Sequence, residues 1–135
     1  MEYVLTADDF TLRLNPVIFE EDIQYPANTF LMVNAECDGF SGSTTMDIDI
    51  KAFRTFVMHL KALYDTLCGT AEIKESYGEQ YLAFSADRTG HIRVSGLLKK
   101  SSREGGRQSM TFENTFDQTY LRPFVSALCK SEDCI

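Results

Sequence analysis

The sequence predicts an α+β fold in which an antiparallel β-sheet packs against two helices. Two stretches place apolar residues at helical spacing, and most of the remaining chain alternates apolar and polar residues as strands do. Short turns separate the predicted strands, which favours an antiparallel meander with the helices over one face or end. The predicted order along the chain is three strands, a helix, four strands and a second helix (βββαββββα).

Seven strands are predicted from alternating or continuous apolar segments. They span residues 10–14, 30–37, 40–48, 70–76, 81–86, 91–99 and 110–115. Asp38–Gly39 suits a tight hairpin between the second and third of them. Residues 16–28 contain two prolines and are expected to form a loop or an irregular sheet edge.

The first helix is predicted over residues 50–67, where apolar side chains recur every three or four positions along one face. Asp47 or Asp49 can cap its first turn, because a carboxylate accepts the free N–H groups there and faces the positive end of the helix dipole. Gly69 is expected to end the helix, since glycine adopts the left-handed conformation at little cost.

A second helix is predicted to begin close to Tyr120, because Pro123 cannot donate a hydrogen bond inside a regular helix. Residues 99–108 contain no apolar side chain and two adjacent glycines, which predicts a mobile hairpin tip. Its basic residues are expected to face acidic strands of the same fold. No internal repeat and no linker interrupts the pattern, so residues 1–135 are predicted to form one domain.

Charge is distributed unevenly along the chain. The first fifty residues contain ten acids and one base, and residues 51–135 contain ten acids and twelve bases, for a net charge of −7. Such a field repels nucleic acid and anionic membranes and attracts a cationic surface. The predicted partner-binding residues are therefore acids of the first segment: Asp8, Asp9, Glu20, Glu21, Asp22, Glu36, Asp38, Asp47 and Asp49.

No pattern of residues predicts catalysis, a cofactor or a metal site. His59 lies off the apolar face of the first helix, His91 begins a strand, and no GxSxG motif presents a nucleophile. Asp47 and Asp49 lack the ligand spacing of a calcium loop. The four cysteines contain no CxxC pair and are expected to be reduced thiols. We therefore predict a protein that is not an enzyme.

Two other classes of function stay open at this point. One is a small-molecule-binding domain with an apolar pocket lined by Phe and Tyr. The other is a carboxylate- or metal-dependent enzyme built on Asp47 and Asp49. The acidic segment could also serve solubility alone. The start of the chain has no secretory signal and no apolar run approaches the roughly 20 residues that span a bilayer, so a cytoplasmic location is expected.

Three segments resemble the WapI-family immunity proteins. They are LxxLYDTLxGTA (Leu60–Ala71), DRTGHIRVSG (Asp87–Gly96) and FENTFDQTYLxxF (Phe112–Phe124), and the resemblance covers roughly residues 28–130. Such proteins protect a bacterial cell from the toxic tip of a contact-delivered toxin. The resemblance implies a cytoplasmic antitoxin that binds a toxin domain tightly and carries no catalytic residues. A nuclease toxin must be cationic to bind RNA or DNA, so an acidic antagonist would be steered towards it.

Overall fold

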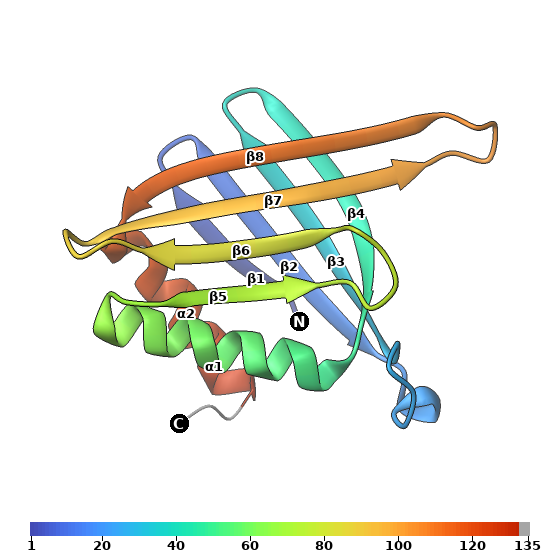
Figure 1. The fold of residues 1–135 in the computed structure, drawn as a ribbon, viewed down its shortest axis with the longest axis horizontal. Coiled ribbons are helices and arrows are strands. Elements are labelled where there is room, and N and C mark those ends of the chain that lie inside the picture. Colours follow the sequence, from blue (N-terminus) through green and yellow to red (C-terminus); the bar gives the residue numbers. More distant parts are fainter. Residues whose placement is uncertain (133–135) are drawn as a thin grey trace.

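The computed structural model describes residues 1–132 and contains two four-stranded antiparallel sheets, each a simple meander (Figure 1). Sheet A comprises β1 (Tyr3–Ala7), β2 (Phe10–Ile18), β3 (Thr29–Cys37) and β4 (Phe40–Ile48). Sheet B comprises β5 (Thr70–Lys74), β6 (Tyr81–Ala86), β7 (His91–Ser101) and β8 (Arg107–Asp117). The helices are α1 (Ile50–Thr66), which joins the sheets, and α2 (Leu121–Glu132), and short 3-10 helices are formed by η1 (Glu20–Asp22) and η2 (Gln118–Tyr120).

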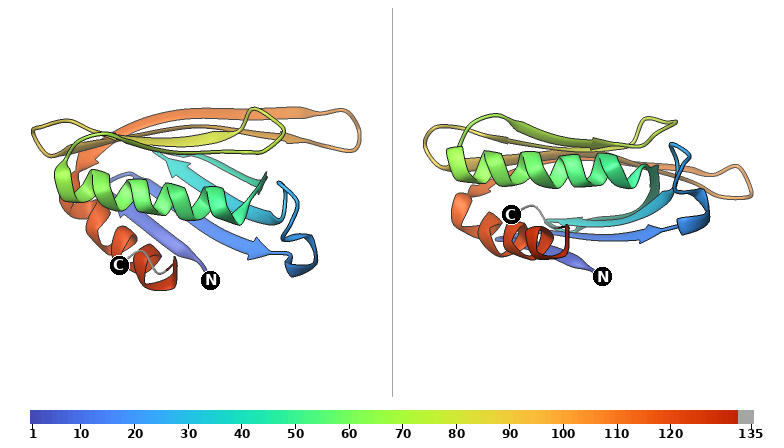
Figure 2. Two further views of the ribbon diagram at one scale, coloured as in Figure 1. Left: turned by 60° about the horizontal axis from the view of Figure 1, so that its bottom comes forward. Right: turned by 90° about the horizontal axis from the view of Figure 1, so that it is seen from below.

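The strands of sheet B cross those of sheet A, and the two helices fill the side on which the sheets diverge (Figures 1 and 2). Helix α1 packs against β5, α2 packs against β1, and the helices pack against each other. On the other side, the sheets approach each other where β4 meets β7. The core therefore lies between the inner faces of both sheets and the two helices.

Aromatic side chains connect the helices to sheet B through this core. Phe56 of α1 lies 5.9 Å from Phe84 of β6, measured between ring centroids, and Phe84 lies 6.4 Å from Phe124 of α2. All three rings are at most 1% exposed. Burying an aromatic side chain of this kind stabilises the fold by about 1.5–3 kcal/mol. The apolar face predicted for the first helix is thus the face that holds sheet B in place.

The predicted α+β class, the antiparallel meander and both helices are confirmed. Asp49 caps α1, since its Oδ1 accepts a hydrogen bond from the backbone N–H of Lys51 at 2.9 Å. The helix ends at Thr66, and Leu67 is its C-cap, adopting the left-handed conformation at φ 52° where Gly69 was predicted to do so; Gly69 follows at φ 91°. The second helix begins at Leu121, immediately after the η2 turn.

The structure adds one strand to the predicted set. Strand β1 pairs with β2 through a two-residue hairpin, in which Ala7 lies opposite Phe10. This turn contains no glycine, because Asp8 adopts a positive φ of 51°, a conformation that aspartate tolerates better than most residues. The eight strands also divide between two sheets, because α1 separates β4 from β5 and ends the first meander.

Two regions predicted as loop are partly regular. Residues 16–18 belong to β2, where Pro16 is tolerated because β1 reaches only as far as Leu14 and leaves that side of β2 open. The hairpin at residues 99–108 continues as paired strand to Ser101 and resumes at Arg107. Its side chains stay polar because this arm of β7 and β8 projects beyond sheet A into solvent (Figure 1).

The expectation of reduced cysteines holds for part of the chain. Cys37, which is half-buried, and Cys68, which is exposed, are free thiols. Burial raises the pKa of the Cys37 thiol. Cys129 is disulfide-bonded, so the prediction is wrong there, and Cys134 lies outside the described residues.

Candidate partner-binding surface

The outer face of sheet A is left uncovered by the rest of the fold. Both helices and sheet B pack on its inner face, where alternate residues of each strand are buried (Figure 2). Antiparallel pairing places the outward side chains in rows across the strands. One row is Val17, Phe30 and Asp47, and the next is Asn15, Met32 and Thr45. Each of these two rows therefore contains both apolar and polar side chains.

Apolar side chains gather at the end of this face where β2 enters the β2–β3 loop. Val17, Phe19, Phe30 and Met32 are 39%, 36%, 45% and 49% exposed, and we call these four residues the aromatic patch. The rings of Phe19 and Phe30 meet edge to face, with centroids 4.6 Å apart and planes at 76°. This is a preferred geometry for two aromatic rings, so the pair holds its arrangement while both rings stay open to solvent.

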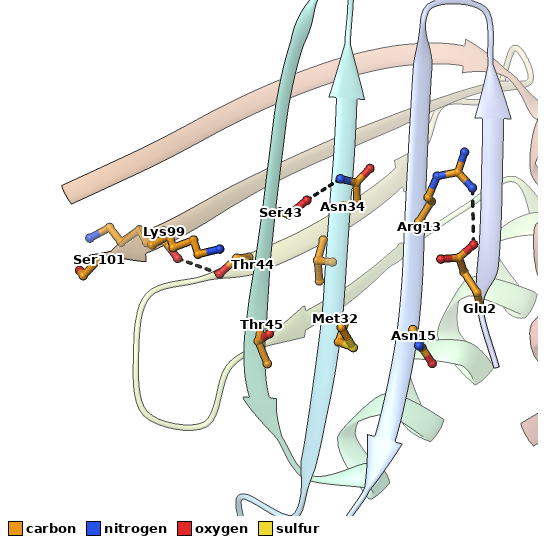
Figure 3. Close-up of a pocket in the computed structure, with 12 residues that line it drawn as sticks. Glu2, Arg13, Asn15, Met32, Asn34, Ser43, Thr44, Thr45, Lys99 and Ser101 are labelled. Carbon is orange, nitrogen blue, oxygen red and sulfur yellow. Dashed lines mark hydrogen bonds and ion pairs between the residues drawn. The ribbon is translucent and has the colours of Figure 1, made fainter. Parts of the chain in front are cut away.

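The middle of the outer face is polar and shallow. A hollow of about 540 Å³ lies there and extends towards the β7 arm (Figure 3). Its polar groups are largely paired with each other: Asn34 Nδ2 donates to Ser43 Oγ at 2.5 Å, and Thr44 Oγ1 donates to the Lys99 carbonyl at 2.8 Å. An open polar hollow differs from the enclosed apolar pocket typical of small-molecule sites, so it does not favour that alternative.

Eight of the nine predicted acids fall into two groups at opposite ends of sheet A. Asp8, Asp9, Glu36 and Asp38 lie at the β1–β2 and β3–β4 turns, and we call them the turn-end acids. Glu20, Glu21, Asp22 and Asp47 lie at the other end, and we call them the loop-end acids. The ninth, Asp49, caps α1.

The two groups are well separated, although each is locally clustered. A backbone hydrogen bond from the N–H of Asp38 to the carbonyl of Asp9, at 3.1 Å, joins the two tight turns. Strands β2 and β3 are nine residues each, which separates the ends by about 27 Å. The acidic segment of the sequence is therefore two charged surfaces, with the neutral middle of the sheet between them.

The turn-end and loop-end acids are all exposed, and within residues 1–132 none of them forms an ion pair. The bases expected to face them pair elsewhere: Lys99 pairs with Glu79, and Arg93 lies 3.7 Å from Glu113. Asp8 accepts a hydrogen bond from the Tyr120 hydroxyl at 3.1 Å, and this bond raises the pKa of Tyr120. Lys99 and Arg93 therefore pair with acids of sheet B and its connections, and not with the turn-end or loop-end acids.

Asn28 fixes the loop that carries three of the loop-end acids. This buried side chain donates through Nδ2 to the carbonyls of Ile23 and Tyr25, at 3.2 and 2.9 Å, and to Asp49 Oδ1 at 3.2 Å. Its Oδ1 accepts from the backbone N–H of Ile50 at 2.8 Å, which ties the loop to the first turn of α1. The β2–β3 loop is therefore anchored to the helix that packs against the core.

The two histidines and the candidate metal ligands form no catalytic grouping in the described chain. His59 is exposed on α1, and His91 Nδ1 lies 2.8 Å from Thr89 Oγ1 in the β6–β7 turn. Asp87 in the same turn accepts from both residues, and these bonds lower its pKa. Residues 1–132 contain no group of three or more His, Cys, Asp or Glu side chains placed to hold a metal ion.

The aromatic patch is the feature that the sequence interpretation missed. The signal for it was present, because Phe30, Leu31, Met32 and Val33 are four consecutive apolar residues within one strand. Since successive side chains of a strand point to opposite faces, two of the four had to lie on the face away from the core. A strand that is apolar on both faces indicates either a second covering layer or a binding surface.

Neither helix of the described chain has the length and hydropathy that crossing a bilayer demands.

Comparison with known proteins identifies one family, since the model of the immunity protein WapI-like family matches residues 5–130. No curated protein and no solved structure matches the chain. The family match spans nearly the whole chain and confirms the resemblance seen in the three sequence segments. The chain therefore belongs to the WapI-like immunity protein family, which implies a protective protein that binds a toxin.

Proposed function

We propose that this protein is a cytoplasmic, non-enzymatic antitoxin that binds a cationic toxin domain, of the nuclease class, through the acidic surfaces of sheet A. Binding one toxin domain would cover its active site, and this requires no reaction by the antitoxin. The family assignment supports the protective role. The binding surface on sheet A and the positive charge of the toxin domain go beyond the family assignment.

The observation that carries the proposal is the set of exposed acids on sheet A without ion pairs in the described chain. A nuclease domain presents lysines and arginines to the phosphates of its substrate. Unpaired carboxylates on the antitoxin would attract those same groups, raise the association rate and orient the two proteins. Carboxylates already paired on their own surface, as on sheet B, would contribute much less.

Two five-acid variants test this difference. The surface variant neutralises exposed acids of sheet A to Asn or Gln: Asp9, Glu20, Glu21, Asp22 and Glu36. The control variant neutralises exposed acids of the remaining chain in the same way: Asp65, Glu72, Glu79, Glu104 and Glu113. Both variants change the net charge by the same amount, so any difference between them reports the position of the acids and whether they are paired with bases.

The binding partner for the assay is a catalytically inactivated toxin domain encoded beside the gene for this protein. We expect the surface variant to associate about tenfold more slowly at low salt and to lose most of its salt dependence. The control variant should remain within about twofold of wild type. Equal rates for both variants would contradict the acidic surface. Failure of the wild-type protein to bind the domain, or to protect cells that produce the active toxin, would contradict the antitoxin function itself.

A further inference from the structure

We infer that the aromatic patch and the loop-end acids together form the docking site for the toxin, and that this site takes an apolar side chain of the toxin surrounded by lysines and arginines. The inference rests on the proposed function and narrows it to one end of sheet A. The turn-end acids then contribute long-range attraction and little direct contact.

The composition of the site is that of a protein–protein binding centre. Two aromatic residues and a methionine lie together at the outer face, and such residues are enriched at the centres of interfaces, where they supply most of the binding free energy. Phe30 and Met32 are about half exposed, at 45% and 49%, although their strand neighbour Leu31 is completely buried. Half-exposed apolar side chains on a face that no other element covers lose further contact with water only when a partner arrives.

Acids surround this apolar centre on two sides. Asp47 lies directly across from Phe30 in the strand register, and Glu20, Glu21 and Asp22 follow Phe19 in the chain. The whole segment of residues 14–50 contains seven acids and no lysine, arginine or histidine. A partner that buries the patch must therefore bring positive charge to the rim, which is the charge of a nucleic-acid-degrading toxin.

The same charge excludes a second copy of this chain as the occupant. Pairing two patches about a two-fold axis would bring each loop-end cluster close to its own copy, with no base from residues 14–50 to offset the repulsion. The turn end is a weaker candidate for the docking centre. Phe40 is 76% exposed there, but it shares its strand face with the buried Met46 and Ile48, so it lies on the inner side of sheet A, and the residue opposite it in the register is Cys37.

The site is also held in shape before binding. The phenyl rings of Phe19 and Phe30 fix each other, the backbone N–H of Phe19 donates to the Asn28 carbonyl at 2.8 Å, and Asn28 anchors the loop to α1. Ordering a loop upon binding reduces affinity, so a loop that is already ordered leaves more of the contact energy for the complex.

Single substitutions at the two ends of sheet A test the inference with the inactivated toxin domain as the probe. Phe30→Thr and Met32→Thr each remove one apolar contact while keeping a residue that favours strands, and Phe40→Thr is the matched control at the other end. We expect each patch variant to weaken binding about tenfold or more, with the control within about twofold of wild type. Circular dichroism and thermal melting establish that all three variants are folded, and the two patch variants serve as independent checks on each other.

Two triple variants test the acidic rim. One neutralises the loop end (Glu20→Gln, Glu21→Gln, Asp22→Asn) and the other the turn end (Asp9→Asn, Glu36→Gln, Asp38→Asn). The loop-end variant should raise both the dissociation rate and the dissociation constant, whereas the turn-end variant should slow association and leave dissociation within about twofold of wild type.

The outcomes separate this inference from the proposed function. If the wild-type protein binds the toxin domain and the patch variants bind equally well, the docking site is wrong and the antitoxin function stands. If the wild-type protein does not bind, both fail together. Light scattering that shows a wild-type dimer, and a monomer for Phe30→Thr, would overturn the inference in favour of self-association.

Discussion

Sheets A and B have the same number of strands and the same meander order, yet they differ in how many of their exposed acids form ion pairs. On sheet B and its connections, Lys74 pairs with Glu72 at 3.1 Å, Lys99 pairs with Glu79, and Arg93 lies 3.7 Å from Glu113. On sheet A, the turn-end and loop-end acids have no ion pairs in the described chain. Exposed pairs contribute little to stability, so the difference concerns partners more than folding.

The comparison teaches that architecture alone does not assign a binding face. Each sheet has one face against the core and one towards solvent, but the outer face of sheet A combines unpaired acids with exposed aromatic rings. A contiguous exposed apolar patch rimmed by polar residues often marks a site of interaction with another protein. The four predictions below compare how far the stability of the fold depends on residues of sheet A and of sheet B, beginning with the largest expected effect.

The clearest contrast is between a buried and an exposed phenylalanine. Phe84→Ala removes a ring that contacts Phe56 and Phe124 and should lower the free energy of unfolding by about 3–5 kcal/mol. Phe40→Ala, at a side chain that is 76% exposed, should cost less than about 1 kcal/mol. Urea denaturation followed by circular dichroism measures both. A large cost at Phe40 would mean that sheet A also depends on its exposed aromatic residues for stability.

The anchor of the β2–β3 loop should have the next largest effect. Asn28→Ala leaves the carbonyl of Tyr25 and the N–H of Ile50 without their partners, so the free energy of unfolding should fall by about 1–3 kcal/mol. The variant should also bind the toxin domain more weakly, since the loop-end acids lose their fixed position. Thr29→Ser keeps the neighbouring hydroxyl bond to Asn28 and is the matched control; it should lose only about 1 kcal/mol for one buried methyl group and bind the toxin domain as wild type does. If Asn28→Ala is destabilised but binds the toxin domain normally, the β2–β3 loop is not part of the docking site.

Two glycines test how closely each sheet is packed. A Cβ at Gly96 of β7 would lie 2.5 Å from Phe112 Cζ and 3.0 Å from Leu82 Cδ2, so Gly96→Ala should destabilise by about 1–3 kcal/mol. A Cβ at Gly42 of β4 would lie 2.9 Å from Met110 Sδ. A thioether can move aside, so Gly42→Ala should change stability by less than about 1 kcal/mol. Equal costs in thermal melting would show that β4 is held as tightly against β8 as the strands of sheet B are against each other.

The smallest expected effect concerns pH. The Thr89 hydroxyl, and then the backbone N–H of His91, hold the pKa of Asp87 below its ordinary value of 3.8. A lowered pKa means that folding favours the ionised form, so this contribution is present above pH 3.8 and is lost as the pH falls through the folded pKa. Asp87→Asn should therefore melt at a lower temperature than wild type at neutral pH, and the gap should close in acid.

Asp9→Asn provides the matched control for that series. Asp9 is exposed on sheet A, and its side chain forms no ion pair within residues 1–132. Its replacement should leave the melting temperature unchanged at neutral and acid pH alike. A pH-dependent difference for Asp9→Asn would show that the turn-end acids are part of the folding energetics.

Much of the fold could be predicted from the sequence because the signals are local. The helical spacing and the Asp49 cap located α1 to within one residue of its observed end at Thr66. The dipeptide Asp38–Gly39 correctly predicted the hairpin between β3 and β4, where the two residues have φ values of 45° and 88°. Strand β1 was missed because its turn contains no glycine. The division into two sheets was missed because periodicity shows which residues form strands and not which strands pair.

The candidate surface could be predicted only in its charge. Counting acids and bases along the chain found the imbalance, but the register of β2 and β3 decides that the acids separate into two groups. The aromatic patch depends on the same register, because Val17 and Phe30 are thirteen positions apart in the sequence and face each other only after pairing. The loop-end acids lie beside the aromatic patch because of the conformation of the β2–β3 loop, which Asn28 anchors and which the sequence pattern does not predict.

The hydrogen bonds of Asn28 have a consequence for the timing of protection. If the toxin is an enzyme, as the proposed function holds, a single free molecule causes damage for as long as it stays unbound. A recognition loop that first had to fold onto its target would add a slow step to every encounter. One buried amide already fastens the loop to the start of α1. Under the proposed docking site, an encounter would therefore need no folding of the loop, and the interval in which the toxin is active would be set by diffusion and charge.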